Sequence, residues 1–241
     1  MITKAVIERV FCLRYANYTG TCFALDVDGR QYIITAKHVV EGIFGVGCPT
    51  QVQILCDQQW IDIGAKLVGE APGKVDIAVL APDRLLSPPS SSFPVATKAV
   101  YGQDLYFLGF PYGMHSDSGV LNRGYPFPLV RKGIMSNFLQ EDDGYTIYLI
   151  DGNNNPGFSG GPVIWAEARK IRSEVPGEIM NMDYKVGAVI SGYRFEYEKV
   201  YLGAQETPLA YKYNTGITIA YAIGDAFLKL IRQNPIGFQI A

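Results

Sequence analysis

The feature that most constrains this chain is its division into short strand-like segments separated by turn residues. Each segment is rich in β-branched or aromatic residues and is bounded by Gly, Asp, Pro or Asn, a pattern typical of β-strands. The segments are Ala24–Val27, Tyr32–Thr35, Gln51–Leu55, Ile77–Leu80, Leu105–Leu108, Thr146–Ile150, Val163–Ile164, Val186–Ile190 and Ile217–Ala222. Between the first two, Asp28-Gly29 is a hairpin signal. The chain therefore predicts many tight turns between paired strands.

Only one segment has the pattern of a helix. The apolar residues of Ala226–Arg232 fall on one helical face, and Asp225 is placed to cap it. Two charged or tyrosine-rich segments, Ala166–Lys185 and Tyr193–Tyr213, are interpreted as excursions between strands. The sequence thus predicts an all-β fold closed by a C-terminal helix.

Charge and hydropathy exclude several classes of partner. The chain has 21 Lys and Arg against 23 Asp and Glu, so it lacks the basic surplus of a nucleic-acid-binding protein. It contains no apolar run approaching the roughly 20 residues that span a membrane. Charged residues interrupt Met1–Tyr15, so this segment does not resemble a secretion signal. We expect a protein that binds neither nucleic acid nor membrane, and a cytoplasmic location.

The cysteines and histidines are too few and too scattered for a zinc site. Cys12, Cys22, Cys48 and Cys56 form no C-x-x-C pair, and the chain contains no H-E-x-x-H motif. An even number of cysteines permits disulfides, but without a secretion signal we expect four reduced thiols, and we expect no metal and no cofactor.

A glycine-rich segment around a serine carries the strongest chemical signal. In Asn155-Pro-Gly-Phe-Ser-Gly-Gly-Pro162, glycines on both sides of Ser159 let the backbone present the hydroxyl and direct N–H groups toward an oxyanion. Gly157-x-Ser159-x-Gly161 also matches the esterase nucleophile elbow, but that family needs a histidine after the serine. Because no histidine follows His115, the α/β-hydrolase is excluded.

The sequence still permits a catalytic triad whose residues follow one another along the chain in the order histidine, aspartate, serine. His38 follows a predicted strand in Thr35-Ala-Lys-His38, and Asp76 precedes an apolar run in Asp76-Ile-Ala-Val. A carboxylate at the entry to a buried strand lies near the interior, where it can accept a proton from an imidazole. The second histidine, His115, is expected to be a surface residue.

These motifs resemble those of the chymotrypsin-like serine peptidases, and most closely the bacterial HtrA/Deg-type branch. Thr35–His38 resembles Thr/Ser-Ala-Ala-His, the Asp76 segment resembles Asp-Ile-Ala-Leu, and the Ser159 segment resembles Asn-Pro-Gly-Asn-Ser-Gly-Gly-Pro. Weaker similarities are Leu108–Gly113, Lys132–Ser136, Val186–Ile190 and Gly216–Ala220.

The resemblance implies two antiparallel β-barrels with the active site in the cleft between them. We assign the first barrel to residues 1–86, a linker to residues 87–99, the second barrel to residues 100–223, and a C-terminal helix and tail to residues 224–241. The proline- and serine-rich stretch Ser87–Pro94 supports this linker. The HtrA branch usually carries a PDZ domain, and we expect none within these 241 residues.

The same resemblance implies a role for each motif residue. Ser159 would attack the scissile carbonyl of a protein or peptide, His38 would transfer the proton, and Asp76 would orient the imidazole. The backbone N–H groups of Gly157 and Ser159 would form the oxyanion hole.

Two departures from secreted animal relatives concern disulfides and activation. Val39 stands where those relatives have a cysteine after the histidine, which favours a reducing compartment. Phe158 stands where they have the acid that captures a new N-terminal amine, so zymogen activation by that route is not expected.

For substrate binding, the resemblance places Asn153 at the base of the primary specificity pocket. Because Asn153 is neutral, no strong preference for Lys or Arg is expected, although Asp151 is close in sequence. Ile190, Ser191 and Gly192 would form the edge that pairs with the substrate backbone. The apolar tail Pro235–Ala241 would dock on the barrels or on a partner.

Three functions fit these motifs. The first is an active serine endopeptidase, which the complete set of His38, Asp76 and Ser159 favours. The second is a catalytically silent binding or scaffold module, suggested by Phe158 and the two excursions. The third is a latent protease that an activating protein partner switches on. We expect catalytic competence; the sequence leaves regulation and oligomeric state open.

Overall fold

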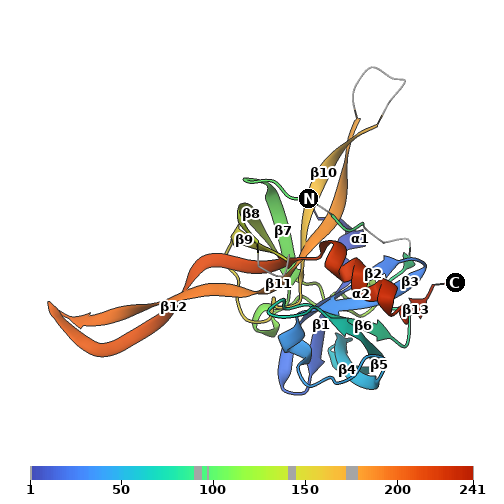
Figure 1. The fold of residues 1–241 in the computed structure, drawn as a ribbon, viewed down its shortest axis with the longest axis horizontal. Helices are drawn as coiled ribbons and strands as arrows, with labels where there is room; N and C mark the ends of the chain where they lie inside the picture. Colours follow the sequence, from blue (N-terminus) through green and yellow to red (C-terminus); the bar gives the residue numbers. More distant parts are fainter. Residues whose placement is uncertain (1, 90–93, 97, 141–144, 172–178, 241) are drawn as a thin grey trace.

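The computed structural model describes residues 2–89, 94–96, 98–140, 145–171 and 179–240, and two rings of antiparallel strands dominate it (Figure 1). The first sheet has the strand order β13-β3-β2-β1-β4-β5-β6, and an additional pairing of β3 with β6 closes it into a ring. Its strands are β1 (Val10–Tyr15), β2 (Tyr18–Val27), β3 (Arg30–Thr35), β4 (Pro49–Cys56), β5 (Gln59–Glu70), β6 (Ala78–Pro82) and β13 (Phe238–Gln239).

The second ring is a closed barrel with the order β10-β11-β12-β9-β8-β7. Its strands are β7 (Asp104–Gly109), β8 (Leu129–Gln140), β9 (Thr146–Asp151), β10 (Pro162–Ile171), β11 (Ile179–Leu202) and β12 (Gln205–Ala222). The helical elements are α1 (Lys4–Ile7), α2 (Gly224–Gln233) and three 3₁₀ turns, η1 (Lys37–Val40), η3 (Pro111–Gly113) and η4 (Gly119–Asn122). The predicted all-β class with two barrels and a C-terminal helix is confirmed.

The predicted elements agree with the structure at most positions. All nine predicted strand segments lie in strands, except that Ile77 precedes β6. Asp28 and Gly29 both have positive φ, 49° and 72°, in the turn that joins β2 to β3, as a two-residue hairpin of the I′ kind requires. The predicted cap was wrong, because α2 begins at Gly224 and places Asp225 inside the helix.

The interpretation of the two excursions was also wrong. The described parts of Ala166–Lys185 belong to β10 and β11, which continue as a hairpin beyond the barrel. Tyr193–Tyr213 forms the far part of the β11–β12 hairpin, which projects well away from both barrels (Figure 1). We call the β11–β12 projection, residues 193–213, the arm.

Three buried clusters form the core: one inside each barrel and one between the barrels. In β2, Cys22 and Ala24 face the interior of the first barrel, because successive side chains of a strand point to opposite faces. Phe23 belongs to the cluster between the barrels, together with Leu108 of β7. Burial of both faces of β2 therefore fixes the second barrel against the first.

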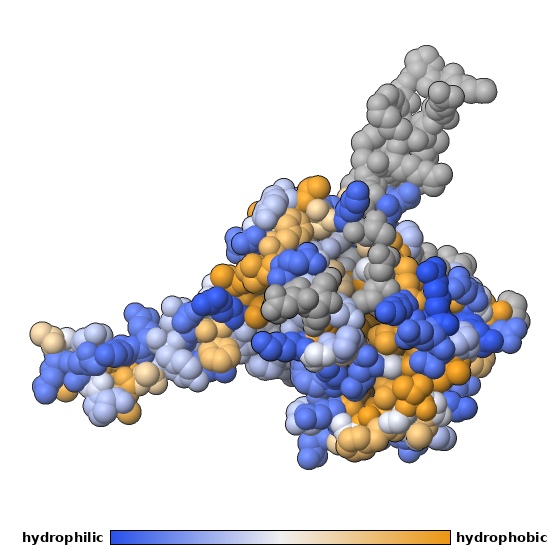
Figure 2. All heavy atoms as spheres, viewed as in Figure 1, coloured by the Kyte–Doolittle hydropathy of each residue, from blue (hydrophilic) through white to orange (hydrophobic). Residues whose placement is uncertain are grey.

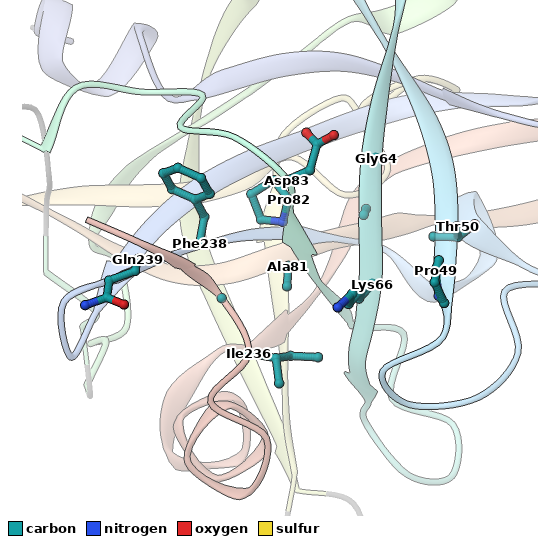
Figure 3. Close-up of a pocket in the computed structure, with 12 residues that line it drawn as sticks. Pro49, Thr50, Gly64, Lys66, Ala81, Pro82, Asp83, Ile236, Phe238 and Gln239 are labelled. Atoms are coloured by element: carbon teal, nitrogen blue, oxygen red, sulfur yellow. The ribbon is translucent and has the colours of Figure 1, made fainter. Parts of the chain in front are cut away.

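The C-terminal segment packs on the first barrel. Phe238 and Gln239 pair with Gln31 and Arg30 of β3. Between this segment and strands β4 to β6 lies a cavity of about 450 Å³ (Figure 3). It is lined by residues 49, 50, 64–66, 81–83 and 236–239, none of which is a candidate catalytic residue. The tail thus completes one wall of the first barrel.

A buried ion pair joins the N-terminal segment to the β2–β3 hairpin and to the beginning of the expected linker. Arg9 is fully buried, and its guanidinium donates to both Asp26 carboxylate oxygens, at 2.6 and 3.0 Å. It also donates to the Pro88 carbonyl at 3.0 Å. Residues 90–93 and 97 of the expected linker lie outside the described residues.

Replacing Arg9 with alanine is expected to lower the free energy of unfolding by about 3–5 kcal/mol, because Asp26 would keep a buried charge without its ionic partner. Arg84→Ala is the matched control, since Arg84 pairs with Asp83 on the surface and such pairs contribute at most about 1 kcal/mol. Urea denaturation of the two variants measures both values. Equal losses would contradict the assigned role of Arg9.

Candidate active site

His38 and Asp76 meet because β3 and β6 are antiparallel neighbours. Thr35, the last residue of β3, pairs with Ala78, the first of β6. The 3₁₀ turn η1 after β3 carries His38, and Asp76 precedes β6, so residues 38 positions apart lie side by side. The His38 Nδ1 lies 2.7 Å from Asp76 Oδ2, and the His38 backbone N–H donates to Asp76 Oδ1 at 3.0 Å.

The Asp76 carboxylate is held ionised in a largely buried position. Its side chain is 14% exposed. Burial raises the pKa of this carboxyl, but hydrogen bonds from His38 and from the Ser191 hydroxyl, at 2.6 Å, outweigh burial and bring the pKa below its usual value. Because the carboxylate can only accept, His38 Nδ1 carries the hydrogen and Nε2 keeps its lone pair.

The hydrogen bond that His38 donates to Asp76 also acts on the imidazole. It raises the pKa of His38 above its ordinary value of 6.5, and burial opposes this effect less strongly. The imidazolium form is therefore stabilised at this position, as a base that must hold a proton transiently requires.

Ser159 lies next to this pair, on the turn before β10. Its Oγ donates to the backbone carbonyl of Ser191 at 2.9 Å, and the Ser191 hydroxyl contacts Asp76. Within the described part of the chain, no hydrogen bond joins Ser159 to His38. The structure thus brings the three predicted residues together around Ser191, with the Ser159 hydroxyl turned toward the Ser191 carbonyl.

Hydrogen bonds hold three carbonyl groups of the turn before Ser159 in place. The carbonyls of residues 156, 157 and 158 accept hydrogen bonds from Tyr112 N–H (2.8 Å), the Thr21 hydroxyl (2.7 Å) and Gly161 N–H (2.8 Å). Since N–H and C=O point in opposite directions in a trans peptide, the N–H groups of Gly157 and Ser159 point away from these donors. Among the described residues, neither N–H donates to a protein acceptor.

Two glycines of this turn cannot be replaced without moving the other barrel or the neighbouring loop. Gly157 has φ +106°, and a Cβ there would lie 2.3 Å from the Phe110 carbonyl oxygen. Gly160 has φ +84°, and a Cβ there would lie 2.0 Å from the Thr21 carbonyl oxygen. The glycines therefore serve both backbone conformation and close contact with β2 and the loop after β7.

Phe158 anchors the turn in the core of the second barrel. It is fully buried and packs edge-to-face on Phe107, with ring centroids 5.2 Å apart. An apolar side chain thus fixes the turn, consistent with the absence of an acid at this position. The sequence could have indicated that Phe158 is buried, since it is the only large apolar residue between Ile150 and Val163.

Sequence reasoning missed Thr21, a buried residue of β2. Its hydroxyl accepts from Phe110 N–H at 3.2 Å and donates to the Gly157 carbonyl, and its N–H donates to the Ser159 carbonyl at 2.8 Å. Thr21 thus connects the first barrel to the serine turn of the second. No local sequence pattern indicates such a contact between distant strands.

The predicted specificity residues occupy different environments. Asn153 is exposed, and its amide oxygen accepts from Asn214 at 3.0 Å. The adjacent Asn154 is the buried one, with Nδ2 donating to the Gly192 carbonyl at 2.7 Å. Ile190 is buried and exchanges hydrogen bonds with Gly160 and Gly161.

A cavity of about 600 Å³ opens beside the pair His38 and Asp76. It is lined by Lys37, His38, Glu41, Gly42, Ile43, Phe44, Glu70, Lys74, Asp76, Ser191 and Tyr221. Both charge signs line it, and Phe44 is strongly exposed at its edge. The cavity provides room for a substrate side chain next to the imidazole.

Other candidate groups lie outside this arrangement. His115 is exposed, as predicted, and its Nδ1 lies 2.7 Å from the Gly113 carbonyl oxygen. The four cysteines are free thiols, with Cys12 and Cys22 buried. Within the described ranges, no cluster of three metal-ligating side chains occurs, and no helix has the length and apolar character to cross a membrane.

Comparison with known proteins gives a family match and several structural matches. A family model described as a trypsin-like peptidase domain matches residues 20–171. The inactive form of a serine-to-alanine mutant of Rv3671c from M. tuberculosis H37Rv is 20% identical, with a TM-score of 0.55 and coverage of 96% of this chain and 88% of that one.

Two further solved structures are similar at the same level. The serine endoprotease from Yersinia pestis is 17% identical with a TM-score of 0.54, and the match covers 98% of this chain and 68% of that one. The HtrA-type protease AlgW with a tripeptide is 18% identical with a TM-score of 0.55, covering 96% of this chain but only 61% of that one. At these identities the structural matches establish the fold alone.

Proposed function

The chain belongs to the trypsin-like peptidase family, and on that basis we propose that it is a serine endopeptidase that uses Ser159, His38 and Asp76. The observation that carries the proposal is the connected set of hydrogen bonds from His38 through Asp76 and Ser191 to Ser159, beside the N–H groups of Gly157 and Ser159, which have no acceptor among the described residues. Membership of the family makes the substrate a protein or peptide.

In the proposed reaction, Ser159 Oγ forms a bond to the scissile carbonyl carbon while its proton passes to His38 Nε2. Asp76 accepts the Nδ1–H of the imidazole and stabilises the imidazolium that results. The negative charge on the carbonyl oxygen is stabilised by the N–H groups of Gly157 and Ser159. The scissile C–N bond then breaks as His38 gives the proton to the leaving amine, which leaves the acyl group on Ser159. A water molecule that gives a proton to His38 attacks the acyl carbon, and the bond to Ser159 Oγ breaks as His38 returns the proton to Oγ.

The resting position of the Ser159 hydroxyl must change before this reaction. Its hydrogen bond to the Ser191 carbonyl has to break so that Oγ can donate to His38 Nε2. The same observation favours a second candidate, a latent protease that needs an activating protein. Activity of the purified protein alone supports the first candidate, and activity only with added cell extract supports the second.

For specificity, we propose a pocket without a fixed charge, because Asn153 and Asn154 are both neutral. Substrate would pair with the edge formed by Ile190, Ser191 and Gly192. Cleavage of a peptide library, read by mass spectrometry, tests activity and specificity together. We expect cleavage without a preference for Lys or Arg; no cleavage of any peptide by the protein, alone or with extract, would contradict the proposed function.

The rate should depend on pH through His38. Its pKa lies above 6.5, and only the neutral imidazole can accept the Ser159 proton. We therefore expect kcat/KM to rise as pH increases through a value above 6.5 and then to level. A profile of kcat/KM between pH 5 and 9 measures this. A rate that is unchanged across that range would contradict His38 as the base.

Thr21 should affect turnover more than substrate affinity. Thr21→Val keeps the side-chain shape but removes the hydrogen bond to the Gly157 carbonyl, so the oxyanion donors lose their fixed orientation. We expect kcat to fall by about 10–100-fold, less than the roughly 100–1,000-fold loss on removing an oxyanion donor itself, with KM changed less. Thr21→Ser should restore most of the rate, and an equal defect in both variants would contradict the role of the hydroxyl.

A further inference from the structure

The arm begins at the candidate active site. Strand β11 passes Ser159 at Ser191 and continues to Leu202, with bulges near Ser191, Arg194 and Val200 where its register against β12 shifts. Its outer part is the arm (Figure 1). In β11, Ala188 to Leu202 pair with β12, while β10 pairs with β11 only as far as Val189. In the described part of the chain, the β11 edge beyond Ile190 has no strand partner, and a Cβ at Gly192 would meet nothing within 4 Å.

The arm also exposes aromatic and aliphatic side chains that a lone hairpin does not bury. Tyr197 is 66% and Leu202 is 78% exposed. The other exposed members of this set are Phe195, Tyr201, Leu209, Tyr211 and Tyr213. Figure 2 shows apolar and hydrophilic residues interspersed along the arm. Tyrosine-rich surfaces of this kind offer large contact areas at low cost in side-chain entropy.

The charges of the arm are satisfied within the arm. It contains three basic and three acidic residues. Lys199 pairs with Glu206, Arg194 with Glu196 at 2.9 Å, and the Tyr211 hydroxyl donates to Glu198 at 2.6 Å. The sixth, Lys212, places its Nζ 3.6 Å from the centre of the Phe195 ring. No excess charge remains to select a charged partner.

We propose that the arm binds the segment of an unfolded protein substrate that precedes the scissile bond. An antiparallel strand added to the β11 edge at Ser191 would run along the arm with its N-terminal residues outermost. Backbone pairing and aromatic contacts favour extended segments of low net charge and varied sequence. This inference rests on the proposed function, because Ser159 defines where the scissile bond lies.

Binding can be measured without cleavage by using Ser159→Ala as the background. Three fluorescent peptides share one cleavage sequence. The first is short, the second is extended by about ten residues toward the N-terminus, and the third is extended by the same number toward the C-terminus. An extended strand rises about 3.4 Å per residue, so the added segment is long enough to run along the arm. We expect the N-terminal extension to lower Kd about tenfold in fluorescence anisotropy, and the C-terminal extension to leave it unchanged.

Two arm variants and one control locate the effect. In the first, residues 197–212 are replaced by Asn-Gly between Glu196 and Tyr213, a cross-strand pair suited to a two-residue turn. The second is Tyr197→Ser combined with Tyr201→Ser. We expect both to reduce the advantage of the N-terminal extension to less than about twofold. Tyr101→Ser, also 66% exposed but on the second barrel before β7, should retain it.

Each outcome separates this inference from the proposed function. The proposal that the arm binds substrate is overturned if the N-terminal extension does not lower Kd for the protein with an intact arm. It is also overturned if the extension still lowers Kd for both arm variants. A third outcome also overturns it. If sedimentation shows a dimer that the shortened arm abolishes, and the N-terminally extended peptide still binds more tightly to that variant, the arm joins copies of the chain. Arm-dependent binding together with no cleavage by the unmutated protein, either alone or with cell extract, supports this inference and contradicts only the proposed function.

Discussion

Ser159→Ala is expected to lower kcat/KM by about a millionfold, the loss seen when the nucleophile of a serine protease is removed. The variant should remain folded, because the Ser159 hydroxyl donates one hydrogen bond, to the Ser191 carbonyl, and one such bond contributes about 1 kcal/mol. Steady-state cleavage of the best library peptide measures the rate, and thermal unfolding checks the fold.

Ser136→Ala is the matched control for this experiment. Ser136 is exposed on β8, and its hydroxyl donates to the Ile134 carbonyl and accepts from the Asp151 N–H, so it has no hydrogen bond to His38, Asp76 or Ser159. It should cleave at the rate of the unmutated protein. A Ser159→Ala variant that cleaves at more than about one hundredth of the normal rate would show that another group is the nucleophile.

Asp76→Asn is expected to lower kcat by about 10⁴-fold without unfolding the protein. An amide facing Nδ1 can donate a hydrogen, which favours the tautomer with hydrogen on Nε2, and that nitrogen can then no longer accept the Ser159 proton. The change also removes the charge that stabilises the imidazolium. Because the hydrogen bond to the Asp76 carboxylate is the largest cause of the raised His38 pKa, that pKa should fall in the variant.

Kinetics and imidazole NMR titration measure these two effects on Asp76→Asn. Asp83→Asn is the control, since Asp83 is a surface carboxylate whose side chain pairs with Arg84 and not with His38. It should change neither the rate nor the His38 pKa. A normal rate in Asp76→Asn would remove Asp76 from the mechanism.

The sequence predicted those strands and site residues that a local pattern of neighbouring residues identifies. Short β-branched runs identified nine strands, and the motifs around His38, Asp76 and Ser159 identified the groups that the fold brings together. Strands β1, β5, β8 and the two-residue β13 were missed. In β8, Lys132 lies on the exposed face and the half-buried Arg131 lies on the opposite face, so charged residues interrupt the apolar pattern on both faces.

Contacts between segments distant in sequence could not be predicted in this way. Thr21 is an ordinary strand residue until β2 is placed against the serine turn. Asn154, and not the expected Asn153, is buried, because the backbone of this turn decides which amide faces inward. The arm was interpreted as an excursion because a hairpin with two solvent-exposed faces has no simple hydrophobic alternation.

The most direct test is covalent labelling of the protein with a fluorophosphonate, followed by intact mass and peptide mapping. An activated serine predicts a single adduct, located on Ser159, whose rate of formation rises with pH through the His38 titration, and no adduct in Ser159→Ala. Labelling of Ser159→Ala to the same extent, or no labelling of the unmutated protein at any pH, would contradict the claim that His38 makes Ser159 nucleophilic.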